Sequence, residues 1–146
     1  MDNSAKTFLR RYRGLVARRE SLQRMIDEAY ERAMSCTVRP KEVQVQSSPM
    51  GDRLAEDVAR ITDATAQLEE TKAQITGALR EILAAIEAVP DETQKAVLTL
   101  RYVEGLDWIR IQEKIGYERT QTLVIHGRAL WHVNRWMEGK NGRAMD

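Results

Sequence analysis

The stretch that decides the fold is residues 98–130, which read LTLRYVEGLDWIRIQEKIGYERTQTLVIHGRAL. Its apolar spacing and its glycines predict three helices. The first helix stops at Gly105, and the second spans Trp108–Ile115, where Asp107 is placed to cap the free N–H groups. Gly116 can adopt a positive φ in the turn that follows, and the third helix is predicted to begin two or three residues later.

Two long segments upstream carry apolar residues at alternating steps of four and three, which is typical of a coiled-coil seam. We expect the helices to span residues 7–33 and 52–89. The first predicted seam consists of Phe8, Tyr12, Leu15, Arg19, Leu22, Ile26, Ala29 and Ala33. The second consists of Leu54, Val58, Ile61, Thr65, Leu68, Lys72, Ile75, Leu79, Ile82, Ile86 and Val89. Arg19 and Lys72 are the polar interruptions of these seams.

Neither helix can leave its apolar stripe in water, so each needs a partner. Two prolines and a glycine lie in residues 35–51, which can reverse the chain direction and which we interpret as a disordered loop. The alternation in residues 43–46, VQVQ, could form a short strand instead. An antiparallel helical hairpin is the simplest solution, and self-association through the surplus length of the second helix is the alternative.

The predicted organisation is all-α throughout, with a boundary at Pro90. Residues 1–89 form the coiled-coil hairpin, residues 90–137 the three-helix module, and residues 138–146 a flexible tail. Asp91 is expected to cap the first helix of the module, with Gln94 as its reciprocal partner in a capping box. Charged residues make up 31% of the chain and aromatic residues 5%, which favours long amphipathic helices over a sheet-built core.

The composition also narrows the compartment and the chemistry. The single cysteine, Cys36, is predicted to be an inert thiol in a loop, and neither a secretory signal nor a membrane span is apparent, so we expect a reducing cytoplasm as the compartment. His126 and His132 lie six residues apart on one helix without a matching cysteine or carboxylate, so no metal site is expected. Since the sequence offers no catalytic constellation or phosphate-cradling loop, we expect neither an enzyme nor a cofactor.

The three-helix module carries the one sharp functional pattern, that of a helix-turn-helix whose third helix reads double-stranded DNA. Residues 110–146 hold seven Lys/Arg against four Asp/Glu, so this end of the chain is basic. Polar and small apolar side chains at the start of the third helix are the candidates for base contacts: Arg119, Thr120, Gln121 and Val124. Basic side chains around them are the candidates for phosphate contacts: Arg110, Lys114 and Arg128. The alternative is a helical bundle whose surface happens to be polar there.

Residues 98–130 resemble region four of bacterial sigma factors, where a scaffold RY-x-EGL-x-W-x-x-I-x-x-x-x-G precedes a recognition helix ending in IH-x-RAL. The matching elements here are Arg101, Tyr102, Glu104, Gly105, Leu106, Trp108, Ile111, Gly116 and Ile125–Leu130. With its coiled-coil hairpin, the whole chain is similar to phage-encoded regulators of the ArpU/RinA type. That resemblance implies sequence-specific DNA binding, control of late phage genes and a phage or prophage origin. It further implies host RNA polymerase as a partner.

The sequence departs from the sigma-factor pattern at several positions. Glu118 stands where the recognition helix usually has a Ser or Thr cap, and Thr122 replaces an inner Val. Leu123 and Val124 follow where polar residues are usual. They could touch thymine methyl groups, or form a second apolar stripe that suits a dimer interface. The members of that stripe would be Leu123, Val124, Leu130, Val133 and Met137.

The predicted function is transcriptional regulation by a homo-oligomer that assembles through its coiled-coil helices. Two other functions remain open at this point. The first is a phage DNA-packaging protein that resembles a small terminase subunit, which also joins a helix-turn-helix to coiled-coil helices. The second is an adaptor protein that binds RNA polymerase or a sigma factor but does not bind DNA.

Overall fold

The computed structural model describes residues 3–37 and 49–145. Its elements are α1 (Ser4–Thr37), α2 (Pro49–Glu87), α3 (Glu92–Leu98), the π-helical turn η2 (Thr99–Val103), α4 (Trp108–Ile115) and α5 (Arg119–Met145). These residues contain no strand, so the all-α prediction is confirmed for them. The 43–46 alternation lies outside the described residues. Cys36 belongs to the last turn of α1 and not to a loop.

The described residues form two compact units. The hairpin unit is Leu15–Gln74, and the C-terminal unit combines the first turns of α1, up to Gly14, with the chain from Ile75 onward. The predicted boundary at Pro90 therefore falls within the C-terminal unit. The last turns of α2 belong to this unit because their apolar side chains are buried in its core.

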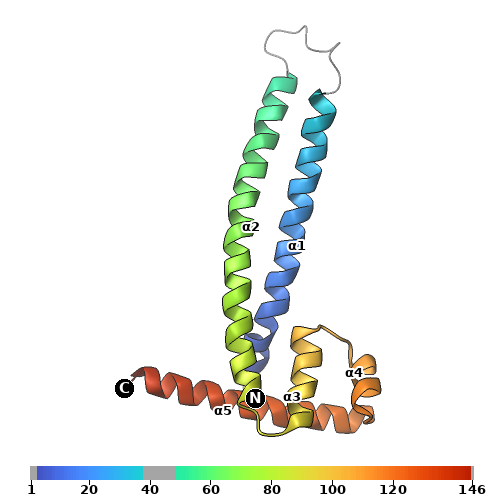
Figure 1. Cartoon of the computed structure of the whole chain (residues 1–146), viewed down its shortest axis with the longest axis vertical. Coiled ribbons are helices and arrows are strands. Elements are labelled where there is room, and N and C mark those ends of the chain that lie inside the picture. The colour runs from blue at the N-terminus through green and yellow to red at the C-terminus, as the bar shows by residue number, and fades with distance from the viewer. Residues whose placement is uncertain (1–2, 38–48, 146) are drawn as a thin grey trace. The chain divides into compact units, whose positions relative to one another are not determined.

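In the hairpin unit, α1 and α2 run antiparallel and side by side (Figure 1). A small apolar cluster lies between them, formed by Leu22, Ile26, Ala64 and Leu68. Near the loop end, Arg32 Nε lies 3.4 Å from the buried Asp57 carboxylate. The two long helices thus cover each other's apolar stripes within one chain, as the seam pattern predicted.

The predicted seam of α2 is confirmed in one of its two columns and only in part in the other. The column that contains Leu68, Ile75 and Ile82 is buried as predicted. In the other column Ile86 is buried as predicted, but Val58 is 52% exposed. Lys72 is also exposed and pairs with Glu69, so it does not interrupt the seam. The second buried column consists of Asp57, Ala64, Thr71, Ala78 and Ala85. Small side chains in this column let the larger residues of the facing helix interdigitate, which large apolar residues would prevent.

The α1 seam shows a smaller difference over its first half. Leu9 and Val16 are buried, whereas the predicted Phe8 and Leu15 are half-buried beside them. Arg19 is half-buried, in keeping with its predicted seam position. The buried stripe of α1 is therefore wider before Arg19 than a strict heptad pattern predicts.

The core of the C-terminal unit draws on segments from both ends of the chain. Its buried members are Ala5, Leu9, Ile82, Ala85, Ile86, Val89, Leu98, Tyr102, Ala129 and Val133. Leu130 and Met137 pack against it, and Val133 is fully buried in it. These three residues of α5 complete the intramolecular core and so are not part of an exposed stripe for dimerisation, whereas Leu123 and Val124, the other members of that alternative, are exposed.

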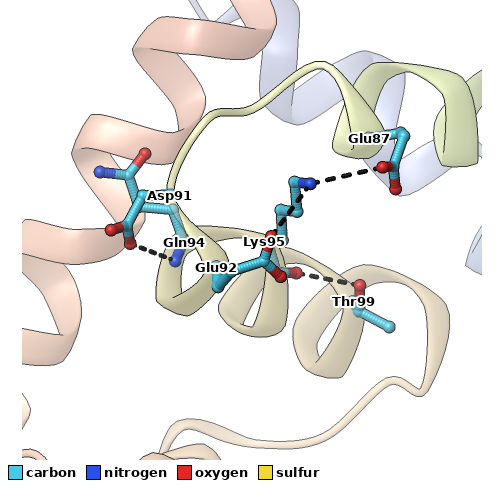
Figure 2. A network of polar contacts seen from close by, with 6 residues as sticks. All are labelled: Glu87, Asp91, Glu92, Gln94, Lys95 and Thr99. Atoms are coloured by element: carbon cyan, nitrogen blue, oxygen red, sulfur yellow. Dashed lines mark hydrogen bonds and ion pairs between the residues drawn. The ribbon is translucent and has the colours of Figure 1, made fainter.

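Figure 2 shows the junction between α2 and α3. Asp91 caps α3 by accepting a 2.9 Å hydrogen bond from the backbone N–H of Gln94. The reciprocal half of the predicted capping box is not formed, since Gln94 Oε1 is buried without a hydrogen-bond partner in the described structure. Lys95 lies 3.3 Å from Glu92 and 3.4 Å from Glu87, which ties the start of α3 to the end of α2. Desolvation lowers the pKa of Lys95, but the two carboxylates outweigh it and leave the pKa raised.

A widened turn links α3 to α4. The backbone N–H of Glu104 donates to the carbonyl of Thr99 at 3.0 Å, five residues back, which defines η2. Gly105 then adopts a φ of +75°, a left-handed conformation that ends the helix as predicted. At the other end of the unit, α5 continues to Met145, so the predicted tail is helical in the described residues.

Candidate nucleic-acid interface

Two helices joined by a tight turn form the frame of the candidate interface. Asp107 Oδ1 accepts a 2.9 Å hydrogen bond from the N–H of Arg110 and caps α4. Gly116 has a φ of +77°, and its N–H donates to Gln112 at 2.9 Å, which closes α4. The carbonyl of Glu118 accepts the first hydrogen bond of α5. The predicted bounds of α4, the roles of Asp107 and Gly116, and the start of α5 are confirmed.

The inner face of α5 holds it against the preceding helices. Thr122 and Ala129 are fully buried, and Ile111 of α4 is buried as well, in agreement with the predicted inner positions. The Thr122 hydroxyl has no hydrogen-bond partner among the described residues, so its methyl group contributes more to packing than its oxygen does. With this face fixed inward, the opposite face of α5 is left outside.

A buried aromatic cluster fastens α5 to η2 and α4. The Tyr102 hydroxyl lies 2.7 Å from His126 Nε2, and the two rings stack at 5.7 Å between centroids. The Trp108 ring meets His126 edge-on at 4.7 Å, and the guanidinium of Arg101 lies 4.6 Å above Trp108. Sequence reasoning had considered His126 only as a metal ligand and missed its role in the cluster.

The electrostatics of the cluster keep His126 neutral. Burial lowers its pKa to about 4, with further lowering by the charges of Lys6, Arg101 and Arg10. Burial also raises the pKa of Tyr102, so the phenol keeps its proton at neutral pH. Because His126 is neutral, one ring nitrogen carries a proton and the other does not, so the tautomer sets which partner donates in the hydrogen bond between the Tyr102 hydroxyl and Nε2. This bond holds the middle of α5 against η2, while Thr120, Gln121 and Val124 of its first two turns stay exposed.

The structure brings most of the predicted base-contact residues together. Thr120, Gln121 and Val124 are exposed and line one concave surface with Arg128. Arg119 is exposed at the first position of α5 but does not line this surface. A polar group, an amide, a small apolar side chain and a guanidinium thus lie within reach of one ligand.

The predicted phosphate-contact residues are more dispersed. Arg128 belongs to the concave surface, while Arg110 is exposed on α4 and lines no part of it. Lys114 is exposed too, but it lines a separate hollow near Glu87 and Glu92. Contacts from Arg110 and Lys114 to the same ligand as Gln121 remain predictions.

The outward face of α5 continues beyond the concave surface with residues that the sequence analysis did not single out. Trp131 is 56% exposed, and the guanidinium of Arg135 lies 5.2 Å from its ring centroid. The spacing of Thr120, Val124 and Trp131 along one helical face was the sequence signal that could have revealed this extension.

Other kinds of site find little support in the described residues. They contain no group of three His, Cys, Asp or Glu side chains able to hold a metal ion. None of the described helices is long and apolar enough to cross a membrane. Comparisons of the chain with protein-family models, curated proteins and solved structures found no match.

Proposed function

We propose that the chain is a sequence-specific DNA-binding transcriptional regulator of phage or prophage origin that acts with host RNA polymerase. In this proposal α4, the Gly116 turn and α5 form a helix-turn-helix related to region four of sigma factors. The first two turns of α5 enter the major groove, because this groove admits an α-helix and presents a distinct pattern for each base pair.

The observation that carries the proposal is the outward face of α5. Thr120, Gln121, Val124 and Arg128 gather around one concave surface there. The segment 119–137 includes three arginines and no acidic residue, so this part of α5 carries a net positive charge. Phosphate groups are the natural counterpart of such a face.

Each side chain has a distinct proposed role. The Gln121 amide can make two hydrogen bonds to an adenine edge, and the Arg119 guanidinium can do the same with guanine. Thr120 can bond to either base, and the Val124 side chain suits a thymine methyl group. Arg128 lies farther along the helix and suits a phosphate.

The regulatory part of the proposal is supported by the resemblance of residues 98–130 to sigma region four. In this proposal the module acts beside a polymerase holoenzyme or on it. We also propose a homo-oligomer, but not through the seams, since Leu68 is already buried against α1 within the same chain.

An adaptor that binds polymerase or a sigma factor without DNA is the second candidate. It is favoured by exposed apolar side chains on α4 and α5, of which Ile109 and Leu123 are the clearest. Apolar side chains in such positions suit a protein partner better than phosphates. The two candidates differ in one measurable property, the binding of free DNA.

The test begins with random duplexes enriched for those that the full-length protein retains. An enriched duplex and a scrambled version are then titrated by fluorescence anisotropy at about 50 mM salt, where phosphate contacts are strong. Gln121→Ala should weaken binding to the enriched duplex by about 1–3 kcal/mol and leave the scrambled duplex unaffected. Gln74→Ala, an exposed glutamine on α2, is the matched control and should bind as the wild type does.

Two results would overturn parts of this proposal. Equal losses of affinity on both duplexes would show that Gln121 contacts the DNA backbone and not the base edges. No binding of the wild type to any duplex, together with retention of RNA polymerase in a pull-down, would favour the adaptor.

A further inference from the structure

The outward face of α5 extends well beyond the two turns that are proposed to enter the major groove. With 3.6 residues per turn, Thr120, Val124, Trp131 and Arg135 fall within an arc of about 60° on the helix. The rise of about 1.5 Å per residue separates Thr120 from Trp131 by roughly 16 Å. The major groove is about 12 Å wide. If the first turn of α5 reaches the bases and the helix axis crosses the groove, Trp131 lies at the edge of the groove, where the sugar-phosphate backbone runs.

Trp131 and Arg135 form a pre-arranged pair at this position. The guanidinium lies over the indole at 5.2 Å, and the His132 ring meets the indole edge-on at 4.9 Å. The indole remains 56% exposed, so a large flat surface faces outward with a positive charge beside it. In contrast, Trp136 packs against Phe8 of α1 in the core, which shows the usual position of an aromatic residue on this helix.

The charge of the surrounding segment limits which partner can cover this surface. Between Glu118 and Glu138 the sequence has three arginines and no acidic residue. A second copy of the same face would bring like charges together, which is unfavourable. A polyanion with apolar sugar surfaces between its charges complements both the arginines and the indole.

We propose that Trp131 and Arg135 bind the sugar-phosphate backbone of double-stranded DNA at the edge of the groove that α5 enters. The inference rests on the proposed function and extends it to a second contact. The indole packs against a deoxyribose, and the guanidinium donates to a phosphate oxygen. Such contacts fix the position of α5 on the duplex and carry no sequence information.

The experiment uses full-length Trp131→Ala and Arg135→Ala, with Arg80→Ala as the control for loss of an exposed arginine on α2. Both changes should weaken binding about tenfold on the enriched and on the scrambled duplex alike. For Arg135→Ala, the slope of log affinity against log salt should fall by about 0.9, the value for one phosphate contact. Arg80→Ala should change neither quantity. Thermal unfolding by circular dichroism checks that each variant is folded.

Tryptophan fluorescence supplies a second readout that does not depend on affinity. Acrylamide quenches exposed indoles, so DNA should protect a fraction of the wild-type emission, and this protection should be absent in Trp131→Ala. Wild-type binding to DNA with unchanged affinity and salt slope in both variants would refute this inference alone. Failure of the wild type to bind any duplex would refute the proposed function as well. A change in sedimentation of Trp131→Ala from oligomer to monomer would assign the face to a second copy and overturn the inference.

Discussion

Acidification should destabilise the C-terminal unit through His126. The ring is 6% exposed and shares a hydrogen bond with Tyr102, so burial favours its neutral form. Burial is the main reason that its pKa is lowered to about 4 from the ordinary 6.5. Because the folded-state pKa lies below the unfolded one, the unfolded chain takes up a proton first as the pH falls. Stability from the neutral ring is thus present above pH 6.5 and is lost as the pH falls towards 4.

The size of this effect follows from the two pKa values. One pKa unit corresponds to about 1.4 kcal/mol, and linkage over the interval from pH 7.5 to pH 5 gives a loss of about 2 kcal/mol in the free energy of unfolding. This is a large fraction of the stability of a small protein, which is typically about 5–15 kcal/mol.

Urea unfolding at several pH values, followed by circular dichroism, measures this loss. His126→Gln should be less stable at neutral pH but should lose about 2 kcal/mol less than the wild type on acidification, because an amide does not titrate. His132→Gln is the control and should keep the wild-type pH dependence. Equal pH dependence of the wild type and His126→Gln would refute the reasoning, as would a His126 pKa near 6.5 from an NMR titration.

Four further substitutions test the core, a turn and a helix cap, and urea unfolding at neutral pH measures each of them. Leu9→Ala should lower the free energy of unfolding by about 2–5 kcal/mol because Leu9 is fully buried. Leu83 is 45% exposed, so Leu83→Ala should lower it much less. Equal losses would contradict the assigned core. Gly105→Ala should lower the free energy of unfolding by about 1–2 kcal/mol because the residue has a positive φ. The added methyl group itself meets only the movable end of the Arg13 side chain, so it adds little to this loss. No loss would argue against the left-handed turn. Asp107→Ala should cost about 1 kcal/mol through loss of the α4 cap, and an unchanged midpoint would contradict the capping role.

Local signals predicted the elements that frame the candidate site. The bounds of α4 follow from Asp107 and Gly116, each of which acts on backbone groups within a few residues. The exposure of Thr120 and Gln121 followed from the periodicity of the inner positions of α5. Features that depend on short-range backbone chemistry were therefore accessible from the sequence.

Features that depend on partners distant in sequence were not accessible. The choice between Val58 and Asp57 for the α2 seam depends on what α1 presents opposite, and Arg32 decides it by pairing with Asp57. The bond between Tyr102 and His126 joins residues 24 positions apart, and no local pattern requires it. The helical continuation of α5 past Met137 was not predicted, although the two glycines of the last segment cost a helix only about 1 kcal/mol each.

The makeup of the C-terminal unit has a consequence for how the chain is made and how its gene can change. Ala5 and Leu9 leave the ribosome well before Ala129 and Val133, which belong to the same core. The unit can therefore close its core only after α5 has emerged, while the hairpin unit can form earlier. For the same reason, recombination that exchanged only the 3′ part of the gene would separate α5 from the two helices against which it evolved to pack.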